Sequence, residues 1–584
     1  MALWRGVTFV VSMVVVACAI SAAALLILYV VISREPAVPA NATLVLPIPG
    51  QLDESREDVI GLVRGPRPRT VRAIVDNLRK AKTDARIRGV MIAPSGLQTP
   101  FWAKLQEIRD AIVDFRKSGK PAIAYLEDGL EREYYLATAC DRIFLMPTSI
   151  LELNGLASYD LFLRGTFDKI GTYPDMLAVG EYKTAINLFT EKGYTTAHRD
   201  MAASLNRDLY DQLVGAIAEG RRKNVAEVRA LLDQGPFLPE EALRVGLIDD
   251  LAYEDQIDDK VQMGTREWRR VTAEEYDGVR PSSLGLNRGP RVAVIYAVGV
   301  INTGRSGWSP SDGPVVGSET LIDYVRKARG DSSVRAIVLR VDSPGGSAVA
   351  SDSIWRELLI TRQGRSAKPV VISMSDLAAS GGYYISMAGS DIVAQPGTLT
   401  GSIGIYSGKM VTEGTFAKLG ATIDGVKNGR FADMQSPVRA YSPEERAKIL
   451  EQMQAYYDQW IEKIAESRGM TPERVDAVAQ GRVWTGKQAR QIGLVDDLGG
   501  LDRAVALAKQ RAKIAADQEV EIVVYPPRRS VYELLLEQFS SLEQAGLGRW
   551  LGMNDRRALG ALTAPMRLFR RGELLALMPM GFLR

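Results

Sequence analysis

Two short segments, one in each half of the chain, carry residue types that together could perform nucleophilic catalysis. Residues 374–386, MSDLAASGGYYIS, place Ser380 among small residues and directly before two glycines. Residues 179–185, VGEYKTA, carry Lys183. A serine hydroxyl is a poor nucleophile until a base takes its proton, and lysine can be that base once burial lowers its pKa and leaves the amine neutral.

An internal repeat relates the two halves. Residues 134–171 match 383–420 at a constant offset of 249, and outside this block the offset becomes 247, as in VGLIDDL (245–251) and IGLVDDL (492–498). We interpret the chain as a tandem duplication with copies at about 42–262 and 290–512. The stretch 275–290, rich in glycine, proline and polar residues, is the expected linker.

The two copies have lost complementary residues. Ser380 stands opposite Glu131, and the SPGG segment (343–346) stands opposite Gly96-Leu97-Gln98-Thr99, so the first copy lacks the nucleophile and its glycine loop. Lys183 stands opposite Ala432, so the second copy lacks the lysine. The alignment therefore predicts one composite site. In it, backbone N–H groups of Gly381 and of Gly345-Gly346 could form an oxyanion hole.

Each motif is weak when taken alone. Ala-Ser-Gly-Gly commonly opens a helix for packing reasons, SPGG is usually a turn, and a lone lysine is usually on the surface. His198 is the alternative base, but it lies in the copy without the serine and within a polar stretch. The reciprocal losses favour the Ser–Lys interpretation.

Alternating strand-like and helix-like runs must position these residues. In the second copy, residues 291–301, 335–343, 368–375 and 390–396 read as buried strands, and 319–329 and 350–362 as helices. This alternation predicts an α/β fold with largely parallel sheets. Residues 520–527 read as a strand that leaves the second copy, within a C-terminal extension covering 513–584.

Both termini suggest contact with a membrane. Residues 6–33 contain no charge and are long enough to span a bilayer, so they predict a retained transmembrane anchor with a cytoplasmic N-terminus and an exported body. Residues 528–584 are rich in Leu, Met and Arg and could lie on a membrane surface or pack on their own protein.

Composition excludes several classes of site. A net charge of +3 over 584 residues gives no general affinity for nucleic acid. With two cysteines, Cys18 and Cys140, and one histidine, His198, neither a structural disulfide nor a zinc site is expected. No cofactor is expected, although a carboxylate site for Mg or Ca stays open.

The chain resembles the signal peptide peptidase A (protease IV) family in its long, duplicated form. The resemblance rests on LRVDSPGGS (339–347), MSDLAASGGYYIS (374–386), TLTGSIGIYSGK (398–409) and VGEYKTA (179–185). It implies a tandem pair of Clp-protease/crotonase-like domains behind one transmembrane helix. It also implies Ser380 as nucleophile, Lys183 as general base, Ser402 as the serine that orients the lysine, and oxyanion donors from Gly346 and Gly381.

The same resemblance implies a homotetramer at the bacterial inner membrane, with its catalytic body on the periplasmic side. Signal-peptide remnants and other hydrophobic peptides would be its substrates. One departure is Asp342, where some relatives carry Asn; it would add a negative charge near the site. Two other hypotheses stay open: a crotonase-like enzyme acting on acyl thioesters, and an inactive scaffold that holds membrane proteins together.

Overall fold

The computed structural model describes residues 35–54, 70–97, 99–261, 269–309, 313–525, 575–578 and 582–583, with a few single residues between 13 and 23. Most of the expected anchor at 6–33 and most of 528–584 lie outside the described residues. Within the described part of the chain, none of the helices has the length and apolar character needed to cross a bilayer.

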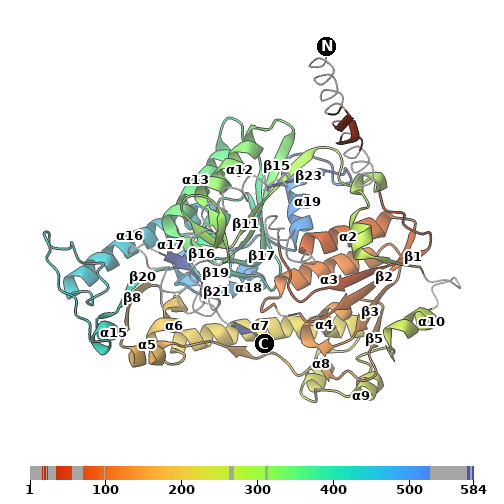
Figure 1. Ribbon diagram of the computed structural model, residues 1–584, viewed down its shortest axis with the longest axis horizontal. Helices are drawn as coiled ribbons and strands as arrows, with labels where there is room; N and C mark the ends of the chain where they lie inside the picture. Colours follow the sequence, from red (N-terminus) through yellow and green to blue (C-terminus); the bar gives the residue numbers. More distant parts are fainter. Residues whose placement is uncertain are drawn as a thin grey trace, which may run out of the picture.

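Two parallel sheets with the same strand order form the framework of the molecule (Figure 1). The first has the order β10-β1-β2-β3-β5-β9 and the second contains the run β23-β11-β15-β17-β18-β22. The matching orders confirm the duplication. The bounds in the first sheet are Ala42–Ile48 (β1), Ile87–Pro94 (β2), Ala122–Leu126 (β3), Arg142–Leu145 (β5), Asp250–Leu251 (β9) and Arg269–Thr272 (β10).

Five strands of the second sheet lie where the sequence predicts strands, and the short strand at 497–498 was not predicted. Its bounds are Arg291–Val298 (β11), Val334–Ser343 (β15), Val370–Ala379 (β17), Asp391–Ala394 (β18), Asp497–Leu498 (β22) and Glu521–Tyr525 (β23). Helices α12 (Ser318–Gly330) and α13 (Ala348–Gln363) follow the two predicted helical stretches. The near-continuous apolar runs of β15 and β17 are explained by burial on both faces of the sheet.

One prediction about the chain's course is wrong. The strand at 520–527 does not leave the second copy, because β23 pairs in parallel with β11 and completes the sheet. Its counterpart β10 does the same for β1 in the first copy. Each sheet therefore takes its last strand from beyond the residue ranges at which the repeats align.

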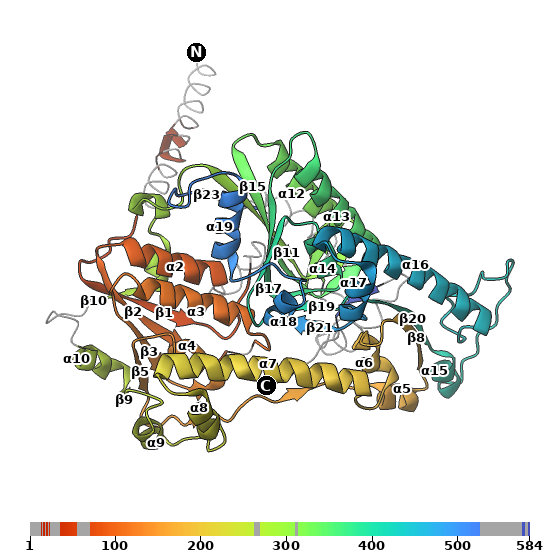
Figure 2. The same cartoon turned by 180° about the vertical axis from the view of Figure 1, so that it is seen from behind.

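Elements of the two copies cross over to one another. The 26-residue helix α7 (Thr196–Arg221) runs from the first sheet to the underside of the second, as Figure 2 shows, while its counterpart α16 (Pro443–Arg468) extends away from the body. Strand β8 (Tyr173–Val179) of the first copy pairs antiparallel with β20 (Ile405–Val411) of the second. This pairing carries the lysine segment of one copy onto the other.

Candidate active site

The structure brings Lys183, Ser380 and Ser402 together in a buried cluster between the two copies. The Lys183 Nζ atom lies 2.8 Å from Ser380 Oγ. The same atom donates to the backbone carbonyl of Ser402 at 2.8 Å and lies 3.0 Å from the Ser402 hydroxyl oxygen. All three side chains are buried, with exposed fractions of 1% for Lys183 and 0% for both serines.

A neutral amine can make all three contacts, as can an ammonium group, and burial favours the neutral form. A neutral lysine has two N–H donors and one lone pair, whereas an ammonium group has three donors and no lone pair. Two N–H groups directed at the carbonyl and hydroxyl of Ser402 leave the lone pair for the Ser380 O–H. Burial lowers the pKa of Lys183 well below the ordinary lysine value. Among the described residues, the amine contacts only hydroxyl and carbonyl oxygens. These neutral oxygens stabilise a positive charge on the lysine less than a carboxylate would.

Close backbone packing between the copies fixes the position of Lys183. Beyond the end of β8, Tyr182 N donates to the carbonyl of Gln480 at 2.7 Å. Gly481, at φ +77°, lies against the lysine backbone, since a Cβ there would be 2.4 Å from Lys183 N. A side chain at this position would push the lysine away from the serine.

Ser380 occupies a strained turn between a strand and a helix. It follows β17, precedes α14 (Gly381–Ser386) and adopts φ 56° and ψ −115°, a region that costs a residue with a side chain about 1–3 kcal/mol. Its backbone N–H donates to the carbonyl of Gly401 at 2.7 Å, which ties the turn to β19 (Leu399–Gly401). The sharp turn presents the hydroxyl group to the lysine.

The glycine loop 343–346 lies beside this turn. A Cβ on Gly381 would be 3.1 Å from Gly346 N, so the backbone of Gly381 lies close against the glycine loop. Gly346 adopts φ +155° and packs against Ile301, whose carbonyl oxygen would be 2.0 Å from an added Cβ. The Ser343 hydroxyl donates to Gly299 O at 2.6 Å and accepts from Gly345 N at 3.2 Å, which fixes the loop.

The corresponding place in the first copy is filled. Glu131 begins helix α4 (Glu131–Ala137) where Ser380 stands in the second copy. The buried Glu133 carboxylate accepts from Leu97 N at 2.7 Å, within the segment that aligns with the glycine loop. The Glu133 side chain therefore occupies the space beside the first copy's counterpart of the glycine loop.

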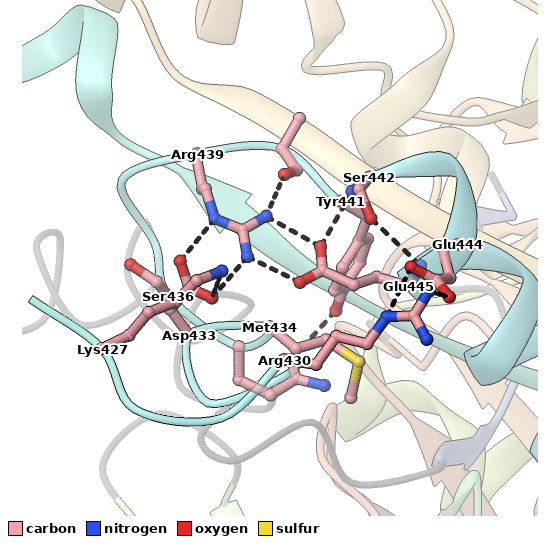
Figure 3. Close-up of polar contacts among 12 residues, drawn as sticks. Lys427, Arg430, Asp433, Met434, Ser436, Arg439, Tyr441, Ser442, Glu444 and Glu445 are labelled. Atoms are coloured by element: carbon pink, nitrogen blue, oxygen red, sulfur yellow. Dashed lines mark hydrogen bonds and ion pairs between the residues drawn. The ribbon is translucent and has the colours of Figure 1, made fainter.

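The second copy's counterpart of the lysine segment has also changed, and Figure 3 shows the polar contacts that Arg439 makes beside it. The segment that contains the exposed Ala432 is held by Arg439, which donates to Asp433 at 2.7 and 2.8 Å and to Glu445 at 2.6 and 2.7 Å. The Arg439 hydrogen bond holds the pKa of Glu445 at about 2. This surface cluster takes no part in the Lys183–Ser380 contact.

Asp342 does not add an unbalanced negative charge near the site. The Lys104 Nζ atom, from helix α3 (Ala103–Arg116) of the first copy, lies 2.8 Å from Asp342 Oδ2 and 3.3 Å from Asp376 Oδ2. Burial raises the pKa of Asp376 to about 6, while the two carboxylates hold the pKa of Lys104 above its ordinary value despite burial. Sequence reasoning missed Lys104 because no motif surrounds it.

Lys104 also stabilises an irregular stretch of the sheet. Between the pairs Val341–Met374 and Ser343–Ala378, β17 has two more residues than β15, and Asp376 lies in this bulge. The bulge lies in β17 shortly before Ser380, and the Lys104 ion pairs join β15, which leads into the glycine loop, to β17, which leads into the nucleophile turn.

We expect Lys104→Met to lower thermal stability, because it leaves two buried carboxylates without their cation at a cost of about 3 kcal/mol. Adding Asp342→Asn to Lys104→Met should recover part of the loss. Differential scanning calorimetry of the wild type and both variants measures the effect; equal Tm values in all three would contradict it.

His198 lies in a different environment. Its ring nitrogens lie 3.4 Å from Asn187 Nδ2 and 3.5 Å from Asp160 Oδ2, and its ring packs edge-on against Tyr194. Burial lowers the pKa of His198. The cluster at Ser380 is thus built around Lys183, and the histidine has its own partners.

Comparison with known proteins is consistent with this architecture. Residues 114–266 and 362–515 each match peptidase family S49. The chain is 36% identical over 455 residues to "Serine protease SPPA, chloroplastic" of Arabidopsis thaliana, covering 77% of this chain and 66% of that protein. It is 33% identical over 488 residues to "Protease 4" of Salmonella typhi (81% and 76%), and 29% identical over 554 residues to "Protease 4" of Haemophilus influenzae (89% and 88%).

Among solved structures, the chain is similar to a mutant of the "1510-N membrane-bound stomatin-specific protease" at 18% identity, with a TM-score of 0.26, over 41% of this chain and 98% of that one. At this score the likeness does not establish the fold family, so the Clp-protease/crotonase-like assignment stays a prediction. The family matches and the names of the relatives define a serine peptidase with a duplicated α/β fold. The chain belongs to peptidase family S49, in its long, duplicated form.

Proposed function

We propose that the protein is a membrane-anchored endopeptidase that uses a Ser–Lys dyad shared between its two copies. The observation that carries this proposal is the 2.8 Å approach of the buried Lys183 Nζ to Ser380 Oγ. The lowered pKa of Lys183 supports a neutral amine at working pH, which is the form that can accept a proton.

The proposed reaction proceeds through an acyl-enzyme. Ser380 Oγ attacks the peptide carbonyl while Lys183 takes the hydroxyl proton, and N–H groups of Gly346 and Gly381 stabilise the oxyanion. The lysine then gives its proton to the leaving amine as the C–N bond breaks. A water molecule, deprotonated by the same amine, hydrolyses the ester and restores Ser380. The role of Ser402 is to hold the lysine through its carbonyl and hydroxyl groups.

The proposed substrates are hydrophobic peptides, including the remnants of cleaved signal peptides. The apolar, uncharged stretch 6–33 supports a single-pass anchor in the bacterial inner membrane with a periplasmic body. A homotetramer and contact with membrane lipid complete the proposal, together with the Clp-protease/crotonase-like fold. All of these rest on the family resemblance.

Cleavage of an internally quenched apolar peptide by the detergent-solubilised full chain tests this function, with Ser380→Ala as the control. We expect turnover in the wild type and none above background in Ser380→Ala. Turnover of an acyl thioester, measured in parallel, distinguishes a thioester enzyme from a peptidase. Thioester turnover that survives Ser380→Ala, without peptide cleavage, would overturn the proposal, and so would a folded wild type that turns over neither substrate.

A further inference from the structure

The described part of the C-terminal extension lies within the sheet beside the candidate site. A third sheet has the order β13-β14-β12-β16-β24-β20-β8, in which β12 is Val300–Asn302, β13 is Gly307–Ser309 and β14 is Gly313–Gly317. Among the described residues, β24 (Leu575–Leu577) is its only strand from the far end of the extension. In this sheet β24 stands between β16 (Gly345–Ser347) and β20. Over the part of the chain that the structure describes, β16 and β20 are joined through β24 and not directly.

The flanking strands belong to the candidate site. Strand β16 contains Gly346, β20 begins three residues after Ser402, and β8, next to β20, ends four residues before Lys183 (Figure 1). Neighbouring strands lie about 4.8 Å apart, so β16 and β20 are separated by about 10 Å, the width of one extended peptide. A segment in that space passes directly alongside Gly346.

Strand β24 pairs with β16 and β20 in the way that a bound peptide adds a strand to a sheet. It runs antiparallel to β16, with Ala576 opposite Gly346 and Leu577 opposite Gly345, and Leu575 also pairs with Tyr406 of β20. Beyond the strand, Met578 N donates to the carbonyl of Pro344 at 2.9 Å. Backbone pairing of this kind binds extended peptides with little dependence on their sequence.

Met578 supplies the side-chain contact. It is buried, with an exposed fraction of 7%, in an apolar cluster lined by both copies: Met201, Ala379, Leu399 and Val483, with the partly buried Tyr182 packed against them. Ala379 directly precedes Ser380, and Tyr182 directly precedes Lys183. The apolar cluster around Met578 therefore includes the residue directly before each member of the dyad.

We propose that the space between β16 and β20 is a binding site for an extended apolar peptide, and that residues 575–578 of the same chain occupy it as a resident competitor of substrates. The proposal deepens the proposed function, on which it rests, by naming the strands that hold a substrate and the segment that restrains the enzyme. A tethered competitor acts at a high effective concentration, so it raises the KM for a free peptide without altering kcat.

The experiment compares full-length variants. Met578→Asp places an unpaired carboxylate in the apolar cluster and should release the segment, whereas Met578→Leu keeps an apolar side chain there. Ala576→Pro, which removes a backbone N–H from β24, should behave as Met578→Asp does. For the quenched apolar peptide we expect KM to fall at least tenfold in the two releasing variants, with kcat unchanged.

A binding measurement separates this proposal from the proteolytic function. A fluorescent peptide with the sequence of residues 573–581 is titrated by anisotropy against each variant combined with Ser380→Ala. At least tenfold tighter binding to Met578→Asp and Ala576→Pro than to Met578→Leu supports the resident strand, even if no variant cleaves peptides. Equal affinity for all three would overturn the resident strand, even where the wild type is an active peptidase.

Discussion

Lys183→Met is expected to lower kcat for the quenched apolar peptide by about 10³-fold, the contribution typical of a positioned general base. Methionine preserves most of the side-chain volume but cannot accept the Ser380 proton. Because the lysine amine is buried and its pKa is lowered, its replacement by an apolar side chain should not lower the Tm. Steady-state kinetics with circular dichroism measures both effects.

Lys409→Met is the matched control. Lys409, in the second copy, is also a buried lysine, but its Nζ donates to the carbonyl of Met434 at 2.7 Å and packs over the ring of Tyr441. Its replacement should leave kcat within about twofold of the wild-type value, because these contacts do not involve the dyad. Near-normal turnover in Lys183→Met would place the base elsewhere and remove the case for a composite site.

Gly346→Ala is expected to lower kcat by about 10²–10³-fold, the usual cost of losing one oxyanion donor. A Cβ at this position would lie 2.0 Å from the carbonyl oxygen of Ile301, and the backbone at φ +155° disfavours a side chain. The strand must shift, and its N–H then moves away from the carbonyl oxygen of the substrate. Because the effect falls on the transition state, kcat should change more than KM.

Gly304→Ala is the control for backbone strain. Gly304 has φ +87° but open space around its Cβ position, so alanine there adds strain without moving the glycine loop. We expect turnover near that of the wild type. Equal losses of kcat in Gly304→Ala and Gly346→Ala would show that strain, and not the position of the Gly346 N–H, causes the effect.

The duplication and the complementary losses could be predicted from the sequence because they are comparisons between aligned residues. The alignment pairs Ser380 with Glu131 and Lys183 with Ala432, and it needs no coordinates. The longer strands of the second sheet were also predictable, since strands buried on both faces appear as long apolar runs.

Contacts between distant segments were not predictable in this way. Lys104 lies in an ordinary amphipathic stretch, and only the packing of α3 on the second sheet brings it to Asp342 and Asp376. The apolar pattern of residues 521–525 predicts a strand but does not show which strand it pairs with. Its pairing with β11 was therefore missed. Likewise, nothing local in LAL (575–577) indicates pairing with the glycine loop.

The most direct test of the shared dyad is the pH dependence of Ser380 phosphonylation by a fluorophosphonate, followed by intact mass. A neutral Lys183 is needed to take the proton, so the labelling rate should fall as pH drops through the pKa of Lys183 and level off above it. Because burial lowers the pKa of Lys183, the labelling rate should level off at a pH well below the ordinary lysine pKa of 10.5. In Lys183→Met we expect slow labelling without this inflection. The same pH profile in Lys183→Met and wild type would contradict a site in which one copy supplies the base and the other the nucleophile.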